Sequence, residues 1–333
     1  MLKEIEIQNF RCFEQIKISG FERVNLIGGK NNAGKTALLE AIFINVVPDA
    51  SSLAILRELR REPLEAIEYM ANRTWDNLFY ALKKDSSIVI IGKKENHTIR
   101  VEMQVEINSL KSSLIFKSRK QEDLSSWLST KVPAGYLRNF RISTSEVPII
   151  PSFIRISGIK LTEAYDNARL DDKDSEVLKA FQILDPTIES VESFSIGEPT
   201  LYLRRKGEKR LPLSLFGDAI NRVAEIILKL VNSQYQILLI DEIENGIHHT
   251  SQREFWRVLF RLAVEMDTQI FATTHSLEML QAFADVGLEQ NQECSSAYFE
   301  LARKLKTNQI IGSRLDLETL SYAIEHQEGV RGE

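Results

Sequence analysis

The feature that most constrains this chain is the segment at residues 29–36, which matches the pattern G-x-x-x-x-G-K-[ST] at every required position. A short apolar run at residues 23–27 precedes it, and a helical pattern at residues 35–46 follows it. A strand, a glycine-rich turn and a helix start in this order gather backbone N–H groups where the helix dipole also favours negative charge. The segment therefore predicts a phosphate-binding loop rather than a chance glycine-rich turn.

The residue types in this loop predict ATP and Mg²⁺ as cofactors. Lys35 is expected to reach the β- and γ-phosphates, and the Thr36 hydroxyl is expected to bind Mg²⁺. Gly29 and Gly34 permit backbone torsions that a side chain would block. The predicted nucleotide-binding residues of the loop are Gly29, Asn31, Asn32, Ala33, Gly34, Lys35 and Thr36.

Composition and charge limit the kinds of partner. With 333 residues, 43% hydrophobic and 27% charged, the chain resembles a globular protein of one large domain or two modest ones. A net charge of −5 gives no general basic field, so any nucleic-acid binding needs a local patch. We find no apolar run near the ~20 residues of a membrane span and expect no membrane partner. Two cysteines are too few for a disulfide framework, which favours a cytoplasmic protein with reduced thiols.

A second motif lies at residues 236–242, where an apolar run ends in Asp241 and Glu242. Near-continuous hydrophobicity is typical of a strand buried on both faces, and ligands bind at the C-terminal ends of such strands. Asp241 is expected to hold Mg²⁺, directly or through water. Glu242 is placed to orient and deprotonate the attacking water. The alternative is a strand that runs into a solvated acidic turn.

A third short apolar run, at residues 270–274, ends next to His275. A helix is expected to follow, with Ser276 as its N-cap. An isolated histidine is more often structural. After a strand that ends in two acids, we interpret His275 as a sensor of the γ-phosphate and include it with Lys35 and Glu242 among the predicted catalytic residues.

Residues 212–222 combine a turn that contains serine and glycine with the start of an amphipathic helix. Free backbone N–H groups at a helix start can bind an anion. Ser214 and Gly217 could thus meet a γ-phosphate offered by another subunit, and the alternative is a simple capped helix.

For two basic segments, Arg11 and the turn at residues 204–210, the sequence leaves two interpretations open. Arg11, in a turn between paired strands, is either an ordinary surface arginine or a neighbour of the nucleotide phosphates. The turn at residues 204–210 is the most basic short stretch. We favour a solvated hairpin tip there over a tip that contacts a nucleic-acid backbone.

The remaining patterns predict the domain organisation. Residues 1–49 and 196–333 are expected to form the two parts of an ATPase core, and residues 50–195 an inserted α+β lobe. Within the lobe we expect helices at 51–61, 63–84, 161–170 and 173–184, strands at 87–91, 97–107, 113–117 and 139–157, and an irregular loop at 118–135.

These motifs, in this order, resemble the ABC-type ATPase heads of the SMC and RecF group. More closely, they resemble the stand-alone AAA family ATPases related to the N-terminal ATPase of OLD nucleases. The resemblance implies an α/β fold, a P-loop NTPase with an ABC/SMC-like head, a mixed sheet and the inserted α+β lobe. It is carried by residues 9–11, 29–36, 213–222, 239–248, 273–276, 298–303 and 317–329.

In such ATPases two heads dimerise around two ATP molecules. The resemblance implies that Ser214 and Gly217 touch the γ-phosphate across this dimer. The sequence departs from the usual pattern at Leu215, where a serine is common, and Ser214 stands one place early. A Q-loop glutamine cannot be assigned, and Gln104, Gln121 and Gln182 are the candidates.

The resemblance also implies a biological role. We expect an ATP-hydrolysing dimer, or a higher oligomer, that acts as a switch for a separate nuclease of the Toprim or HNH type in antiphage defence. One alternative is a RecF-like DNA-repair ATPase that binds DNA directly. Another is a scaffold that binds ATP without hydrolysing it, which Leu215 supports and the Asp241–Glu242 pair opposes.

Overall fold

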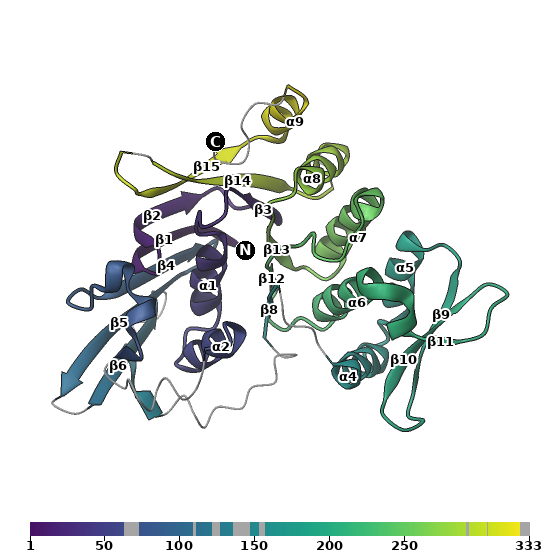
Figure 1. The fold of residues 1–333 in the computed structure, drawn as a ribbon, viewed down its shortest axis with the longest axis horizontal. Coiled ribbons are helices and arrows are strands. Elements are labelled where there is room, and N and C mark those ends of the chain that lie inside the picture. The colour runs from purple at the N-terminus through teal and green to yellow at the C-terminus, as the bar shows by residue number, and fades with distance from the viewer. Residues whose placement is uncertain are drawn as a thin grey trace.

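The structure is a computed structural model of the 333-residue chain (Figure 1). It describes residues 1–62, 73–108, 111–121, 127–135, 147–152, 157–290, 293–304 and 306–326. Within these ranges, none of the helices is both long enough and apolar enough to cross a membrane.

A mixed six-stranded sheet forms the centre of the molecule, in the order β15-β14-β3-β13-β12-β8. Five strands run parallel, and β15 runs antiparallel to β14. Every residue of β3, β12 and β13 is buried, which explains their largely apolar sequences. The bounds are β3 (Val24–Gly28), β8 (Ile149–Ile150), β12 (Ile237–Ile240), β13 (Gln269–Thr273), β14 (Ser296–Arg303) and β15 (Ile310–Leu315).

A second sheet is antiparallel throughout, in the order β2-β1-β4-β5-β6-β7. Its last strand corrects an expectation, because part of the segment predicted to be an irregular loop pairs with β6, with Val132 buried opposite Leu114. The bounds are β1 (Leu2–Phe10), β2 (Phe13–Ser19), β4 (Ile88–Lys94), β5 (Thr98–Asn108), β6 (Lys111–Lys120) and β7 (Leu128–Pro133).

Helices cover the two faces of the central sheet. Figure 1 shows α1 between the two six-stranded sheets, with α2 beside it, and shows α6 (Gly217–Val231), α7 and α8 on the other side of the central sheet. Two hydrophobic cores result, one on each side. The bounds are α1 (Lys35–Val46), α2 (Ser51–Leu59), α7 (Gln252–Glu265), α8 (Leu277–Glu289) and α9 (Leu317–Glu325).

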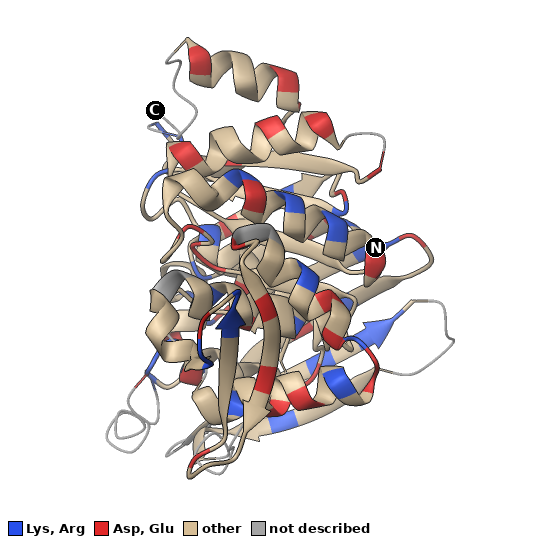
Figure 2. Cartoon of the chain, turned by 90° about the vertical axis from the view of Figure 1, so that its right-hand side faces the viewer, with Lys and Arg blue, Asp and Glu red and all other residues tan. Residues whose placement is uncertain are grey.

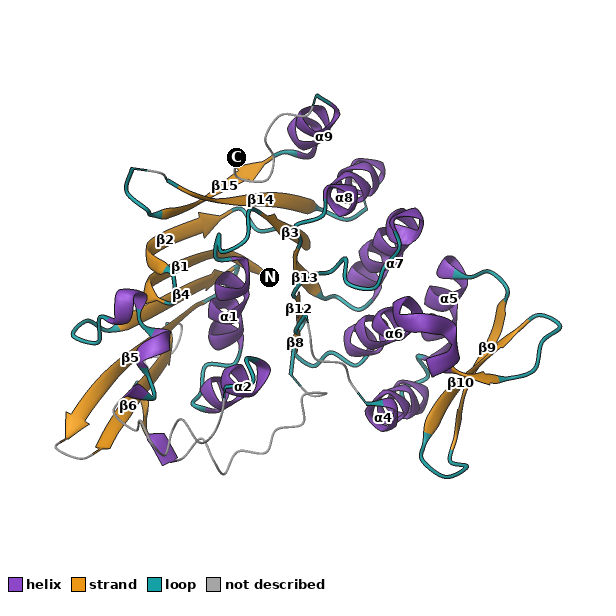
Figure 3. Ribbon diagram, viewed as in Figure 1, coloured by secondary structure: helices purple, strands orange, loops and turns teal. Residues whose placement is uncertain are grey.

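A small three-stranded antiparallel sheet, in the order β11-β10-β9, lies outside α4, α5 and α6 (Figure 3). Together these elements contribute to the second core. The predicted division of the chain at residues 49 and 195 stays a prediction. The bounds are α4 (Gly158–Leu170), α5 (Asp174–Leu184), β9 (Ile188–Phe194), β10 (Thr200–Arg205), β11 (Leu211–Pro212) and α6 (Gly217–Val231).

Some expectations fall wholly or partly outside the described residues. Of the helix expected at 63–84, residues 63–72 lie outside them. The rest contains two single 3-10 turns, η2 (Asp76–Leu78) and η3 (Tyr80–Leu82), because Phe79 between them is extended and forms a β-bridge with Phe10. Of the expected strands at 139–157, residues 139–146 and 153–156 lie outside, as does the chain after residue 326.

Candidate active site

The predicted phosphate-binding loop connects β3 to α1, so it lies at the C-terminal edge of the central sheet. Gly34 has a φ of 97°, and a Cβ there would lie 2.9 Å from the sulfur of Cys12 and 2.9 Å from the Phe13 ring. Gly29 has a φ of 136°, and a Cβ there would lie 2.3 Å from the carbonyl oxygen of Leu301. Both positions therefore require glycine for their torsion and for the space around them.

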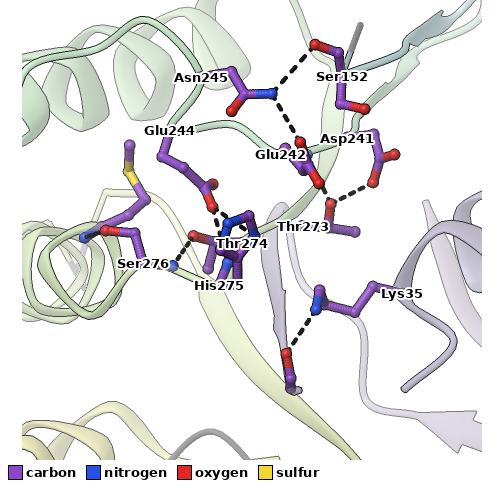
Figure 4. Close-up of polar contacts among 12 residues, drawn as sticks. Lys35, Ser152, Asp241, Glu242, Glu244, Asn245, Thr273, Thr274, His275 and Ser276 are labelled. Atoms are coloured by element: carbon purple, nitrogen blue, oxygen red, sulfur yellow. Dashed lines mark hydrogen bonds and ion pairs between the residues drawn. The ribbon is translucent and has the colours of Figure 1, made fainter. Parts of the chain in front are cut away.

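Lys35 folds back over this loop. Its Nζ donates hydrogen bonds to the carbonyl oxygens of Gly29, at 2.6 Å, and Lys30, at 3.1 Å. Burial lowers the pKa of Lys35, while the charges of Asp241 and its acidic neighbours act in the opposite direction. The ammonium group is thus held by uncharged acceptors beside the loop (Figure 4).

Thr36 and Asp241 meet across the gap between α1 and β12. The Thr36 hydroxyl lies 3.2 and 3.1 Å from the two carboxylate oxygens of Asp241. Burial raises the pKa of Asp241. A hydroxyl and a buried carboxylate form an oxygen-only donor set, which suits a hard cation such as Mg²⁺. The two predicted metal ligands therefore lie together and fit this ion.

Thr273, at the end of β13, links the two acids of the second motif. Its hydroxyl donates to Asp241 Oδ1 at 2.6 Å and accepts from the backbone N–H of Glu242 at 2.9 Å. Thr273 is fully buried. Sequence reasoning missed this role. The available signal was its position at the end of the strand that pairs with β12.

Glu242 stands at a turn with a φ of 49°, in the left-handed region. Its carboxylate accepts a hydrogen bond from the side-chain amide of Asn245 at 2.9 Å. In Figure 4 its side chain points toward Asn245. The geometry leaves the second carboxylate oxygen, Oε1, outside this bond.

His275 follows β13 and is held by Glu244. The Glu244 Oε1 atom accepts from the backbone N–H of His275 at 2.9 Å and lies 3.1 Å from its Nδ1. Ser276 caps α8, as predicted, by accepting from Met279 N–H at 3.2 Å. The His275 side chain is 47% exposed.

Arg11 lies in the β1–β2 turn, and its guanidinium is bound by other parts of the chain. Its Nε lies 3.0 Å from Glu40 Oε2 on α1, and an N–H donates to the carbonyl of Asn77 at 2.9 Å. Burial lowers the pKa of Arg11. The side chain is 7% exposed, so the interpretation as an ordinary surface arginine is wrong. Its contact with phosphates stays a prediction.

Ser214 and Gly217 belong to a different part of the molecule. Ser214 lies in the short helix η5 (Leu213–Phe216), which leads into α6, and both residues are exposed. This turn packs on the second core, whereas the loop around Ala33 packs on the first. The structure of one chain therefore does not bring them to the phosphate-binding loop.

The basic hairpin between β10 and β11 is largely paired with acids. Arg204, Arg205 and Arg210 form ion pairs with Glu189, Asp185 and Glu192, at 3.4, 2.8 and 2.7 Å. Figure 2 shows basic and acidic residues interspersed on this side of the molecule. The pairing favours the solvated hairpin over a nucleic-acid contact.

The three glutamine candidates lie outside the central sheet. Gln104 is on β5, Gln121 follows β6, and Gln182 on α5 donates to the carbonyl of Ile188 at 3.0 Å. On the side of β12 away from β13, the neighbouring strand of the central sheet is β8. Ser152, two residues beyond the end of β8, is not a glutamine.

A glycine-rich loop before a helix, next to a strand that ends in two acids, defines a P-loop NTPase, and comparison with known proteins gives the family. The sequence model of the AAA ATPase domain family matches residues 1–176. A second AAA domain model, whose description mentions the AbiEii toxin and a type IV TA system, matches residues 133–280. The chain belongs to the AAA ATPase domain family.

Individual proteins are also similar to this chain in sequence. An ATP/GTP phosphatase of Helicobacter pylori (strain ATCC 700392 / 26695) is 24% identical over 384 aligned positions that cover both chains fully. The DNA replication and repair protein RecF of Bacillus cereus (strain G9842) is 28% identical over 129 residues, which are 38% of this chain and 28% of RecF.

Two solved structures share the fold at 12% identity. An Smc head bound to the C-winged helix domain of ScpA has a TM-score of 0.53 and covers 96% of this chain and 98% of its own. An Smc head with an extended coiled coil, bound to the C-terminal domain of ScpA from Pyrococcus furiosus, has a TM-score of 0.52, with coverage of 98% and 99%. The predicted fold class is confirmed, because the chain shares the fold of these Smc heads and carries the AAA ATPase domain. Its likeness to OLD nucleases stays a prediction.

Proposed function

We propose that this chain binds MgATP at residues 29–36 and hydrolyses it in a site completed by a second copy. The observation that carries the proposal is a cluster at the C-terminal edge of the central sheet. The Thr36 hydroxyl lies 3.2 and 3.1 Å from the two carboxylate oxygens of Asp241, and the Thr273 hydroxyl joins Asp241 to the backbone N–H of Glu242. The Lys35 ammonium lies over the loop that precedes Thr36. A small-molecule binding loop alone would need neither Glu242 nor His275.

Each residue has a proposed role. Backbone N–H groups of the loop bind the phosphates, and Lys35 exchanges two carbonyl oxygens for phosphate oxygens. Thr36 and Asp241 would hold Mg²⁺, which supplies neutralisation of phosphate charge. Glu242 accepts the proton of the attacking water, and His275 donates toward the γ-phosphate. Arg11 braces α1 through Glu40 beside the loop.

A second copy of the chain would give the turn that contains Ser214 and Gly217 a role in the site. Ser214 and Gly217 would approach the γ-phosphate of a partner chain, so ATP binding would assemble a dimer and hydrolysis would release it. We propose that this cycle switches a separate effector, a nuclease of the Toprim or HNH type in antiphage defence. The effector and its role rest on the resemblance to OLD nuclease ATPases.

A second candidate function is direct DNA binding in repair. The likeness to RecF over 38% of the chain favours it. The ion pairs of Arg204, Arg205 and Arg210 weigh against the hairpin as the DNA contact. A non-hydrolysing scaffold is the third candidate, which measured turnover would exclude.

The test measures phosphate release, ATP binding and mass in solution for three forms of the full chain. We expect turnover by the unchanged chain, loss of ATP binding by Lys35→Ala, and retained binding with at least about 100-fold slower turnover for Glu242→Gln, since general base catalysis contributes roughly 10²–10⁴-fold. MgATP should double the mass of Glu242→Gln, as measured by light scattering.

Lys35→Ala with MgATP is the matched control for the mass measurement. Near-normal turnover by Glu242→Gln would contradict its role as the base. ATP binding without turnover in the unchanged chain would favour the scaffold, and a mass that ignores MgATP would contradict the nucleotide-dependent dimer.

A further inference from the structure

Asn245 lies between the proposed base and the edge of the central sheet. Its side-chain Nδ2 donates to Glu242 Oε2 at 2.9 Å and to the carbonyl oxygen of Ser152 at 3.2 Å (Figure 4). We propose that Asn245 is a positioning residue for Glu242, with the Ser152 carbonyl as its fixed anchor. The inference rests on the proposed role of Glu242.

The amide geometry sets the direction of the carboxylate. An asparagine side chain has two N–H donors on one nitrogen and one acceptor oxygen. Both partners of this nitrogen are acceptors, a carboxylate and a carbonyl, so the opposite orientation of the amide would bring oxygen against oxygen. The Ser152 carbonyl thereby fixes the rotation of the Asn245 amide, and the amide fixes one oxygen of Glu242.

The backbone around Glu242 is already fixed, which leaves its side chain as the remaining freedom. Its N–H donates to the Thr273 hydroxyl at 2.9 Å, and the next N–H, of Ile243, donates to the Thr273 carbonyl at 2.9 Å. The N–H of Asn245 donates to the Glu242 carbonyl at 3.0 Å, closing a tight turn. Holding Oε2 leaves Oε1 to accept the proton of the water.

The anchor lies two residues beyond a strand of the central sheet. Ser152 follows β8, whose Ile150 pairs with Ile240 of β12, and the Asp241 N–H donates to the Ile150 carbonyl at 2.9 Å. The Glu242 carboxylate is therefore connected, through Asn245 and Ser152, to the same sheet that carries Asp241. A general base held in this way loses less orientational freedom when the water binds, so its fixation acts on turnover and leaves ATP binding unchanged.

The experiment uses the full chain and measures turnover and ATP affinity for Asn245→Ala, alone and combined with Glu242→Gln. We expect Asn245→Ala to lower kcat at least about 10-fold with the Kd for MgATP within about twofold. In the Glu242→Gln background it should add less than about twofold, because two residues that act as a unit are not additive.

Asn232 provides a matched control. Its Nδ2 also donates to two oxygens, the carbonyls of Ala164 at 2.9 Å and Leu228 at 2.8 Å, far along α6 from the proposed base. Asn232→Ala should keep kcat within about twofold. Asn245→Asp, which cannot donate and adds a charge beside Glu242, should be slower than Asn245→Ala.

Two outcomes would overturn the inference: unchanged kcat in Asn245→Ala, or an equal fold loss with and without Glu242. Should Asn245→Ala fail to bind MgATP, Asn245→Ser, with the same readouts, takes its place, since its hydroxyl retains one donor. Glu242→Gln alone reports on the proposed function. If it turns over normally, the proposed base is wrong, whereas slow Glu242→Gln with normal Asn245→Ala contradicts only the positioning role.

Discussion

Thr273 shows how one hydroxyl can serve two acidic residues. It donates to Asp241 and accepts from the backbone of Glu242, so it uses its donor and an acceptor lone pair in a fully buried place. The contact exists because β12 and β13 pair in parallel with Ile240 opposite Ala272. This register places the end of β13 beside the turn after β12.

Thr273→Val keeps the shape of the side chain and removes the hydroxyl. Asp241 Oδ1 and the Glu242 N–H both lose a partner, so we expect a stability loss of about 1–3 kcal/mol and a kcat at least about 10-fold lower, since misplaced reacting groups are costly. Urea unfolding and phosphate release measure the two effects.

Thr162, buried on α4, is the matched control for a valine substitution. Its hydroxyl donates to the carbonyl of Gly158 at 2.9 Å within its own helix. Thr162→Val should leave kcat within about twofold. Turnover by Thr273→Val at the unchanged rate would contradict the linking role.

Residue roles could be predicted where local chemistry sets them. The pattern of the loop requires Gly29, Gly34, Lys35 and Thr36 wherever phosphates are bound, because torsion and charge are local demands. The partner of Arg11 could not be predicted, since Glu40 is 29 positions away and only the packing of the β1–β2 turn on α1 brings them together.

At the scale of elements, α6 completes the short edge strand β8. The N–H groups of Leu239 and Asp241 donate to the carbonyls of Pro148 and Ile150 on one side of β8. The alternate carbonyls, of Val147 and Ile149, accept from Lys229 Nζ at 3.0 and 2.9 Å on the other side. The buried Lys229 ammonium thus donates to edge carbonyls that would otherwise need the N–H groups of another strand.

Lys229→Met should change the pH dependence of stability. Burial lowers the pKa of Lys229 from 10.5 to about 8, with Glu225 acting to raise it and Arg222 and Lys160 acting to lower it. Between pH 8 and 10.5 the unfolded chain binds more protons at this residue than the folded chain, so stability from Lys229 rises with pH across this window. Below pH 8 both states are charged and the cost of burial is constant.

The measurement is urea unfolding of the unchanged chain and of Lys229→Met, each at pH 7.0 and 9.5. Subtracting the unfolding free energy of the variant from that of the unchanged chain at each pH cancels the contributions of the other titrating groups. The unfolding free energy of the unchanged chain should gain about 2 kcal/mol over Lys229→Met between these values. A difference independent of pH would contradict a neutral amine in the folded state at pH 9.5.

Elements could be predicted where burial is one-sided or complete. The strands β3, β12 and β13 have largely apolar sequences, and polar turns separate the apolar segments of β4, β5 and β6. The strand β7 was missed because only Val132 of its six residues is buried, which leaves no alternation to detect. The lysine that completes β8 had no local signal at all.

At the scale of the whole molecule, the phosphate-binding loop and the turn at residues 213–217 lie apart within one chain. The loop at residues 29–36 packs on the first core and the turn at residues 213–217 on the second, on opposite sides of the central sheet. Motif order predicted the head fold. The arrangement of sheets required pairings such as Gly28 with Glu300, whose separation along the chain no local pattern encodes.

Leu215→Arg, in the Glu242→Gln background, tests whether the turn forms the nucleotide-dependent contact. The Leu215 side chain is exposed at 67%, beside the exposed Ser214 and Gly217. A charge placed there would be buried without a partner in the proposed dimer, which should weaken assembly by about 100-fold or roughly 3 kcal/mol. Light scattering with MgATP measures the loss of the doubled mass.

Leu128→Arg is the matched control, because Leu128 on β7 is 73% exposed and belongs to the other six-stranded sheet. It should keep the doubled mass, and both variants should bind ATP within about threefold of the parent, since neither leucine touches the loop. A doubled mass in Leu215→Arg would move the interface away from this turn. Loss in both variants would mean that added charge opposes assembly wherever it lies. Loss in Leu215→Arg alone, with ATP still bound, would require the turn of one chain to face the nucleotide of another.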